Sequence, residues 1–238
     1  MDVKEKEAEI IVSNNETALV QPQQYIPEKT DSLLIGKILK RLIDILGGIV
    51  GTFVLIPLTI GIAIANLICK DNGPIFYSQY RIGKNGKLFK MYKYRSMVVG
   101  ADEKLKKYLE ENEEARKEYK KYKKLKHDPR VTKVGEFIRK TSLDEFPQFI
   151  NVLKGDMSLV GPRPYLEREK EDMNGYYKYI TTFKPGLTGL WQISGRSDVD
   201  FVTRIDLDMQ YYYNHSLKGD IKILFKTAMK LVKREGAL

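Results

Sequence analysis

The sequence predicts a mostly helical α+β fold whose N-terminal part enters a membrane. Three observations support this prediction. An uncharged run of 25 residues extends from Ile45 to Cys69, and this length is enough to cross a bilayer. A glycine-containing turn at 83–86 separates two aromatic-rich segments, which is typical of a β-hairpin. Apolar residues recur at helical spacing in much of the remaining chain.

The composition favours an anionic partner and argues against several kinds of site. The chain has 238 residues and a net charge of +10, which suits phospholipid headgroups, a nucleotide or nucleic acid. Cys69 is the single cysteine and there are two histidines, so neither a disulfide nor a cysteine- or histidine-based metal cluster is expected. Residues 1–31 are polar, without a signal peptide, and are expected to form a flexible tail.

The apolar segment within residues 32–70 has two interpretations. Pro57 lies near the middle of the uncharged run, so the segment is either a kinked transmembrane helix or a helix that breaks and returns. Basic residues flank the run on both sides, and the positive-inside rule then favours two cytoplasmic ends. A broken helix in lipid needs polar cover for its backbone, which Thr52 and Thr59 are able to supply. On the residues alone both interpretations stay open.

Residues 71–126 combine a basic hairpin with a charged helix. The aromatic-rich hairpin carries cations that include Lys93 and Arg95. Basic and aromatic residues together also suit nucleic-acid binding, but the apolar segment just before them favours contact with headgroup or substrate phosphates. Residues 101–126 contain Glu–Lys pairs at i,i+4 spacing and are expected to form a solvated helix.

The stretch 141–164 carries the candidate chemistry. Ser142 and Glu145 fit a capping box, which would set Asp144 and Glu145 at the positive end of a helix that Gly155 terminates. The turn at 161–164 is a rigid Gly-Pro-Arg-Pro that holds one guanidinium outward. The two acids also fit a purely structural role as cap and surface residues. The neighbouring cations and the apolar segment favour phosphate chemistry instead.

The C-terminal third is expected to be largely helical. We expect a surface helix at 165–180 and a structured loop at 185–197 with Trp191 buried or at an interface. A helix at 199–213 follows, bearing Asp208. The last helix, 219–234, is amphipathic and either lies on the membrane or packs on the core.

Taken together, these motifs resemble the bacterial monotopic phosphoglycosyl transferases, or polyprenyl-phosphate sugar-1-phosphate transferases. The matching pieces are KRLIDILGGIV, GPIFYSQYRIG, FKMYKYRSM, TSLDEFPQFINVLKGDMSLVGPRP, KPGLTGLWQISGR and DMQYYYN, within residues 36–235. The family often has serine before the proline, where this chain has Ile56. The side chain of Ile56 cannot form the hydrogen bond that such a serine would supply at the break. The chain shows none of the extra N-terminal helices of long members and is expected to be a minimal catalytic form.

The resemblance implies a topology and a location. It favours the re-entrant form, with residues 32–70 as a helical hairpin broken at Pro57. Residues 71–238 are then a catalytic domain with a charged helical insert at 101–126. The protein is expected to be monotopic, with this domain on the cytoplasmic face of the bacterial inner membrane.

The resemblance also implies an activity. The family moves a sugar 1-phosphate from a UDP-sugar to undecaprenyl phosphate, releases UMP, and thereby primes exopolysaccharide, capsule or glycoconjugate assembly. It makes Asp144 the nucleophile that forms an aspartyl-phosphosugar intermediate and a ligand of Mg²⁺. Glu145 is expected to position a group or accept a proton.

Further residues are candidates for substrate binding. They are Arg139 and Arg163 for phosphate or uridine, Pro162 and Pro164 beside Arg163, Lys93 and Arg95 for the acceptor phosphate, and the acid Asp208. The long insert weakly indicates galactose or glucose as the sugar. Nucleic acid is not an expected partner, and a homodimer stays open. The alternative function is a non-catalytic membrane scaffold that binds anionic lipid or polymer.

Overall fold

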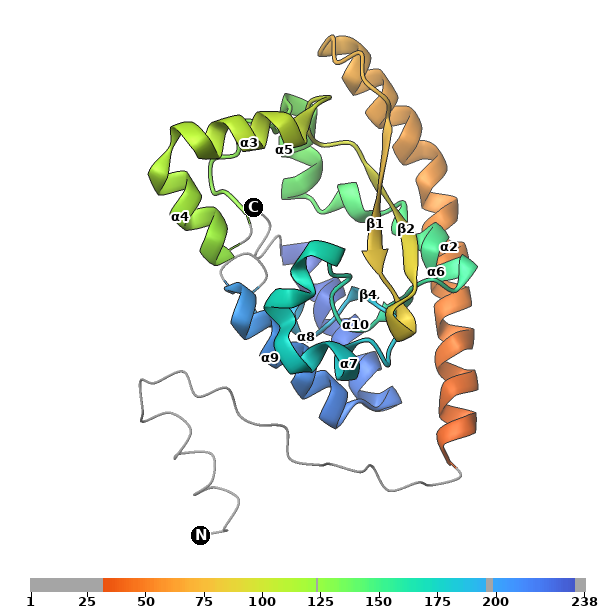
Figure 1. The fold of residues 1–238 in the computed structure, drawn as a ribbon. Coiled ribbons are helices and arrows are strands. Elements are labelled where there is room, and N and C mark those ends of the chain that lie inside the picture. Colours follow the sequence, from red (N-terminus) through yellow and green to blue (C-terminus); the bar gives the residue numbers. More distant parts are fainter. Residues whose placement is uncertain (1–31, 123, 196–198, 234–238) are drawn as a thin grey trace.

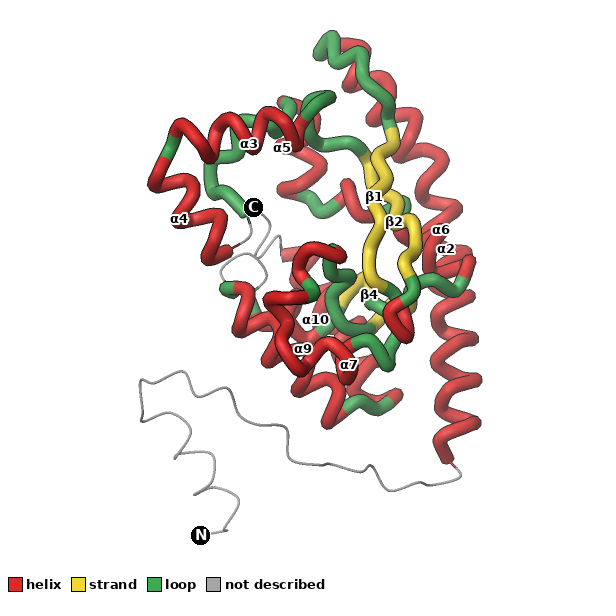
Figure 2. Tube along the Cα trace, in the orientation of Figure 1, coloured by secondary structure: helices red, strands yellow, loops and turns green. Residues whose placement is uncertain are grey.

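The computed structural model describes residues 32–122, 124–195 and 199–233 and has the expected α+β, mostly helical fold (Figure 1). The predicted tail, 1–31, lies outside the described residues. Figure 2 shows the β-hairpin with the long first helix on one side of it and most of the other helices on the opposite side. The elements are α2 (Ser32–Ile68), β1 (Phe76–Ile82), η1 (Lys84–Gly86), β2 (Leu88–Tyr94), α3 (Ala101–Glu111), α4 (Glu113–Tyr122), α5 (Lys133–Lys140), η2 (Leu143–Glu145), α6 (Gln148–Lys154), β3 (Ser158–Val160), η3 (Glu167–Glu169), η4 (Glu171–Tyr176), α7 (Tyr177–Ile180), β4 (Gly186–Thr188), α8 (Leu190–Ser194), α9 (Phe201–Asn214) and α10 (Leu217–Lys233).

Helix α2 is continuous through Pro57, so the expected break does not appear as a helix end. Proline removes one backbone donor but leaves the rest of the hydrogen-bond ladder in place, which bends a helix without ending it. In Figure 1 the C-terminal part of α2 leans away from the line of its N-terminal part. The Thr59 hydroxyl donates to the Leu55 carbonyl at 2.6 Å and lies 2.6 Å from the Tyr94 hydroxyl.

One face of α2 packs along the rest of the protein. Near its start, the Arg41 guanidinium donates to the carbonyls of Val152 and Leu153, both at 2.8 Å, at the C-terminal end of α6. Asp44 accepts bonds from the Ser158 hydroxyl and the Leu159 amide. These bonds fix α2 to α6 and β3.

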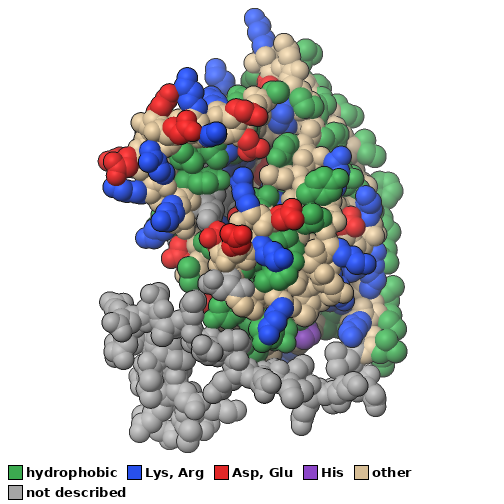
Figure 3. All heavy atoms as spheres, viewed as in Figure 1, with side chains coloured by type: hydrophobic (Ala, Val, Ile, Leu, Met, Phe, Trp, Pro, Cys, Tyr) green, Lys and Arg blue, Asp and Glu red, His purple; other side chains and the backbone are tan. Residues whose placement is uncertain are grey.

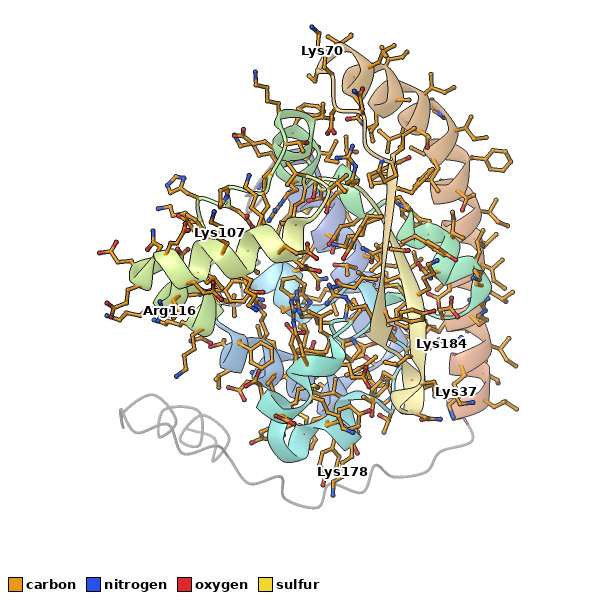
Figure 4. The ribbon with its side chains drawn as sticks, turned by 45° about the horizontal axis from the view of Figure 1, so that its top comes forward. Lys37, Lys70, Lys107, Arg116, Lys178 and Lys184 are labelled. Atoms are coloured by element: carbon orange, nitrogen blue, oxygen red, sulfur yellow. The ribbon has the colours of Figure 1, made fainter. Side chains whose placement is uncertain are left out.

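The opposite face of α2 is apolar and exposed. The helix is long and apolar enough to cross a membrane over Leu34–Ile68. Figure 3 shows hydrophobic side chains along the edge of the molecule that α2 forms. Figure 4 shows Lys37 and Lys70 at the two ends of this helix.

The predicted β-hairpin is confirmed. Strands β1 and β2 pair antiparallel, from Phe76 opposite Tyr94 to Ile82 opposite Leu88. Asn85 and Gly86 have φ values of +56° and +78° in the turn, which suits an asparagine and a glycine. The buried Asn151 of α6 accepts from the Tyr92 amide and donates to the Lys90 carbonyl, so it binds the outer edge of β2.

A second, parallel pair of strands carries the Gly-Pro-Arg-Pro turn. Strand β3 pairs with β4 through Ser158–Gly186 and Val160–Thr188. The backbones of Gly161 and Gly186 approach so closely that a Cβ atom on either would overlap the other's backbone. Glycine is therefore required on both sides where β3 runs into the turn.

Two expected helices differ from the structure. The charged insert is two helices, α3 and α4, which meet at Asn112; the Asn112 side chain accepts from the Ala115 amide at 3.0 Å and caps α4. The segment 165–180 is a series of short turns, η3, η4 and α7, instead of one surface helix. Its apolar side chains, such as Met173 and Ile180, belong to the core. The helices expected at 199–213 and 219–234 are confirmed as α9 and α10.

Candidate active site

Asp144 and Glu145 lie in a single 3-10 turn, η2, between α5 and α6. Ser142 has a left-handed backbone (φ +57°), and its side chain makes no capping bond, so the predicted capping box is wrong. Pro147 stands immediately before α6, and the α-helix itself begins at Gln148. The acids therefore precede the helix by one turn instead of occupying its first turn.

Burial, more than any helix end, sets the ionisation of Asp144. Its side chain is only 13% exposed, and loss of solvent raises its pKa to about 6, with the Glu145 charge adding to the rise. The positive charges of Lys93 and Arg139 act in the opposite direction. The acids were expected at the positive end of a helix, but burial and these neighbouring charges decide the ionisation of Asp144, and its carboxyl is still mostly ionised at pH 7.

Lys93 joins the two acids from strand β2. Its ammonium group lies 2.9 Å from Glu145 Oε1 and 3.7 Å from Asp144 Oδ2. Lys93 was predicted from sequence as a substrate-binding residue, and the structure brings it to the acid pair. The charged groups of this cluster thus come from two elements far apart in sequence.

These residues face one large cavity of about 1590 Å³. Its walls come from α2, the hairpin, α3, η2, α6, the Gly-Pro-Arg-Pro turn, α8, α9 and α10. Six of the predicted site residues that carry charge line it together: Lys93, Arg95, Arg139, Asp144, Glu145 and Arg163. The volume is sufficient for a nucleotide sugar and a second ligand, because typical small-molecule sites measure about 300–1,000 Å³.

A group of arginines surrounds Trp191 in another part of this cavity. The Arg163 guanidinium carbon lies 5.3 Å from the centre of the Trp191 ring, and that of Arg204 lies 5.5 Å from it. Arg81 also lines the cavity. Burial and the charge of Arg163 lower the pKa of both Arg81 and Arg204 to about 10. Cations that lower the pKa values of one another in this way favour an anionic ligand.

Polar atoms in this group are also left without protein partners. The Arg81 Nε, Arg163 Nε and Trp191 Nε1 atoms are buried and make no hydrogen bond to any residue that the structure describes. Buried donors normally have partners, and exceptions are frequent at binding sites. Arg81 and Arg204 were not predicted as site residues, because they lie on β1 and α9 and only the fold brings them to the Gly-Pro-Arg-Pro turn.

Asp208, Pro162 and Pro164 lie outside the cavity wall. Asp208 is fully buried behind the turn, where its Oδ2 accepts from the Arg163 amide at 3.1 Å and the Tyr165 hydroxyl at 2.8 Å. Burial raises its pKa to about 7. These three residues shape the backbone that carries Arg163, which is a different position from the substrate contact predicted for them.

Arg95 lines the cavity but its donors are committed elsewhere. The guanidinium binds both carboxylate oxygens of Asp71, at 2.8 and 3.1 Å, and the carbonyls of Pro74 and Met97. The side chain is 6% exposed. Its contacts hold the chain after α2 against the end of β2, which is a structural position.

The acid pair offers only some of the ligands that the predicted Mg²⁺ would need. Among the residues that the structure describes, no group of three or more acidic, histidine or cysteine side chains is arranged to hold a metal ion. Mg²⁺ usually takes one or two carboxylates and completes its shell with water and substrate phosphates. Asp144 and Glu145 both line the cavity and would supply two such carboxylates.

Comparisons with known proteins agree on one family. A model described as bacterial sugar transferase matches residues 35–234. The chain is 46% identical over 226 residues to the undecaprenyl-phosphate galactose phosphotransferase of Salmonella typhimurium, covering 95% of this chain and 46% of that relative. It is 46% identical over 202 residues to the UDP-galactose-lipid carrier transferase of Erwinia amylovora, covering 85% and 42%.

A shorter relative matches over nearly its whole length. The exopolysaccharide production protein ExoY of Rhizobium meliloti is 44% identical over 204 residues, which cover 85% of this chain and 90% of that relative. The chain thus spans less than half the length of the Salmonella and Erwinia relatives and most of the length of the Rhizobium one.

Proposed function

The chain belongs to the bacterial sugar transferase family, and on this premise we propose that it transfers a sugar 1-phosphate from a UDP-sugar to undecaprenyl phosphate and releases UMP. The relatives named for undecaprenyl-phosphate galactose transfer and for exopolysaccharide production support this assignment. The observation that carries it is the pairing of Asp144 and Glu145 with Lys93 inside one cavity. The step would prime the assembly of an exopolysaccharide or capsule.

The proposed reaction has two displacements at one phosphorus atom. In the first, an Asp144 carboxylate oxygen attacks the phosphorus that bears the sugar, the anhydride bond to the second phosphorus breaks, and UMP leaves with that bond's electron pair. In the second, a phosphate oxygen of undecaprenyl phosphate attacks the same phosphorus and the Asp144 carboxylate leaves. The product is undecaprenyl diphosphate sugar, and the enzyme returns unchanged.

The neighbours of Asp144 have separate parts in this scheme. Lys93 lowers the pKa of the nucleophile and lies where it would also contact a phosphate oxygen. Arg139 faces the same cavity and has a buried Nη1 atom without a partner in the described part of the chain, which suits a phosphate contact. Glu145 would position Lys93 through their 2.9 Å contact. Mg²⁺ held by Asp144 and Glu145 would neutralise the diphosphate charge.

The arginine group around Trp191 suits the nucleotide end of the donor. Arg81, Arg163 and Arg204 provide positive charge in the cavity, and a planar guanidinium binds phosphate oxygens in pairs. Asp208 would act from behind the turn as a positioning residue for Arg163. The sugar itself is a hexose in this proposal, with galactose favoured by the names of the Salmonella and Erwinia relatives.

We further propose that the protein is monotopic, with both ends of α2 on the cytoplasmic side. Contacts between α2 and the rest of the protein extend from Lys40, at Asp220, to Ile62, in the core cluster of Val134 and Ile138. That length is about 33 Å at 1.5 Å per residue, similar to the hydrocarbon thickness of about 30 Å. An upright α2 would carry a charged domain into the bilayer. A re-entrant or in-plane α2 avoids that cost, with residues 71–238 as the catalytic domain.

The experiment that tests the function is release of UMP from UDP-galactose or UDP-glucose in detergent with undecaprenyl phosphate. We expect turnover with at least one donor and its loss in Asp144→Asn. A Glu110→Gln variant, at an exposed acid of α3 that is absent from the cavity wall, serves as the control whose removal leaves the pair intact. Anionic-lipid binding without UMP release from any donor would favour the scaffold alternative.

A further inference from the structure

Three apolar residues of α2 face the catalytic cavity. Leu46, Val50 and Val54 follow one another at four-residue spacing and all line it, so they form one stripe on the helix. Leu46 and Val50 are 64% and 65% exposed. This stripe borders the site of Asp144 and is an apolar surface that the described residues leave uncovered.

Helix α10 provides a second wall. Its residues Leu224, Thr227 and Ala228 line the same cavity. The two helices are joined near their starts by the ion pair between Lys40 and Asp220, at 2.5 Å. In both helices the cavity-lining residues come later in the sequence than this ion pair. The ion pair therefore closes one end of the groove between α2 and α10.

Apolar residues line much of the remaining surface of the groove and lead to the acids. Phe149, Leu159 and Leu187 line the cavity between the two helices. Phe149 packs against Gly51 of α2, where a Cβ atom would overlap the ring. Phe146, one residue after Glu145, lines the cavity next to Phe149 at 5.5 Å between ring centres. Apolar residues thus continue from the groove to the nucleophile.

We propose that this groove, named here the α2–α10 groove, holds the isoprenoid chain of the lipid acceptor. The inference rests on the proposed function and adds the route by which the acceptor reaches Asp144. A hydrocarbon chain gains about 25 cal/mol for each Å² of apolar surface removed from water, whereas a nucleotide sugar would leave its polar groups unpaired there. Lys93 at the end of the groove matches the phosphate of the acceptor in charge.

The groove also meets the membrane surface of the protein. Leu46 and Val50 lie on the same helix as the exposed apolar residues Ile49, Phe53 and Ile60, which we place in lipid. The acceptor chain would then pass from the bilayer into the groove without crossing water. The donor would approach from the arginine group, which lies with Trp191 on other elements of the cavity wall.

The test separates the two half-reactions in Val50→Trp and Ala228→Trp, which fill the groove from opposite helices. Exchange of labelled UMP into the UDP-sugar without acceptor reports the donor half-reaction. We expect exchange within about twofold of wild type and a KM for undecaprenyl phosphate raised about tenfold, since overfilling a tight apolar site costs roughly 1–3 kcal/mol. A soluble short-chain prenyl phosphate should be much less affected. Ile60→Trp, exposed on α2 and absent from the cavity wall, is the matched control and should behave as wild type.

Three results would overturn the groove assignment. One is an unchanged undecaprenyl phosphate KM in both groove variants. Another is an equal loss with the short-chain acceptor. The third is a loss of vesicle binding alone, which would make the groove a site for bilayer lipid. Absence of UMP exchange in the wild-type protein would instead refute the covalent mechanism, and the inference that rests on it would fail with it.

Discussion

At the scale of single residues, the buried carboxyl of Asp144 ties the proposed chemistry to pH. A protonated carboxyl is a poor nucleophile, and the pKa of Asp144 is raised to about 6. The rate of UMP exchange should therefore fall about tenfold for each pH unit below 6. Lys93 lowers this pKa, so Lys93→Met should move the acidic limb of the pH–rate profile to higher pH.

The matched control for Lys93→Met is Lys90→Met. Lys90 is exposed on the same strand and does not line the cavity, so its removal should leave the profile in place. The exchange rate measured from pH 5 to pH 9 distinguishes the two variants. An acidic limb that stays at the same pH in Lys93→Met would contradict the electrostatic role of this lysine.

Removing the charge of the same carboxyl should abolish function and increase stability. Its folded-state pKa of about 6 exceeds the ordinary value of 3.8, so its contribution to stability is present below 3.8 and is lost as pH rises through about 6. At pH 7 Asp144→Asn should abolish exchange and yet raise the free energy of unfolding by ~1–2 kcal/mol. Thermal unfolding measures this change, with the exposed Glu110→Gln as control. A destabilised Asp144→Asn protein would show that the charged form is the favoured one in the fold.

Residue chemistry was predictable from sequence where neighbours in the chain decide it. The adjacent acids, the Gly-Pro-Arg-Pro turn and Lys93 were recognised because their motifs are local. The direction of the Asp144 shift was not, because burial by distant elements outweighs the local helix end. Arg81 and Arg204 were missed for the same reason, since each becomes a site residue only beside Arg163 and Trp191.

At the scale of elements, the contact between α2 and α6 holds the acids in place. A Cβ atom at Gly51 would overlap the Phe149 ring, whereas nothing lies within 4 Å of one at Gly61 on the same helix. Gly51→Ala should destabilise the protein by ~1–3 kcal/mol through overpacking and slow UMP exchange. Gly61→Ala should stabilise it by up to ~1 kcal/mol, because alanine is the better helix former.

Thermal unfolding and exchange, measured on both glycine variants in one detergent, test this pair. Equal melting temperatures for Gly51→Ala and Gly61→Ala would mean that α2 moves freely relative to α6.

The helices and strands that were predicted correctly are those with a clear residue periodicity. The hairpin and α10 were recognised from their periodicity, whereas the insert was expected to be one helix because a single capping asparagine, Asn112, is a weak signal among many charged residues.

At the scale of the whole molecule, both ends of α2 should lie on one side of the membrane. Cys69 is the single cysteine and is exposed at the C-terminal end of the helix. Lys37→Cys in a Cys69→Ser background places a thiol at the other end. In the proposed topology both thiols would face the cytoplasm, so a membrane-impermeant maleimide should label both proteins only in inside-out vesicles.

The composition predicted membrane association. The topology of α2, however, depends on packing that cannot be deduced from the sequence. The expected break at Pro57 does not end α2, and the proposal of two cytoplasmic ends now rests on contacts from Lys40 to Ile62. Labelling of the two cysteines from opposite sides of the membrane would refute that proposal and support a transmembrane α2.

The covalent intermediate can be detected directly by intact-protein and peptide mass spectrometry after incubation with UDP-galactose and UDP-glucose in the absence of lipid acceptor. The account predicts release of UMP and a hexose phosphate adduct on Asp144, which disappears when undecaprenyl phosphate is added. An adduct on any other side chain, or UMP release that requires the acceptor, would contradict it.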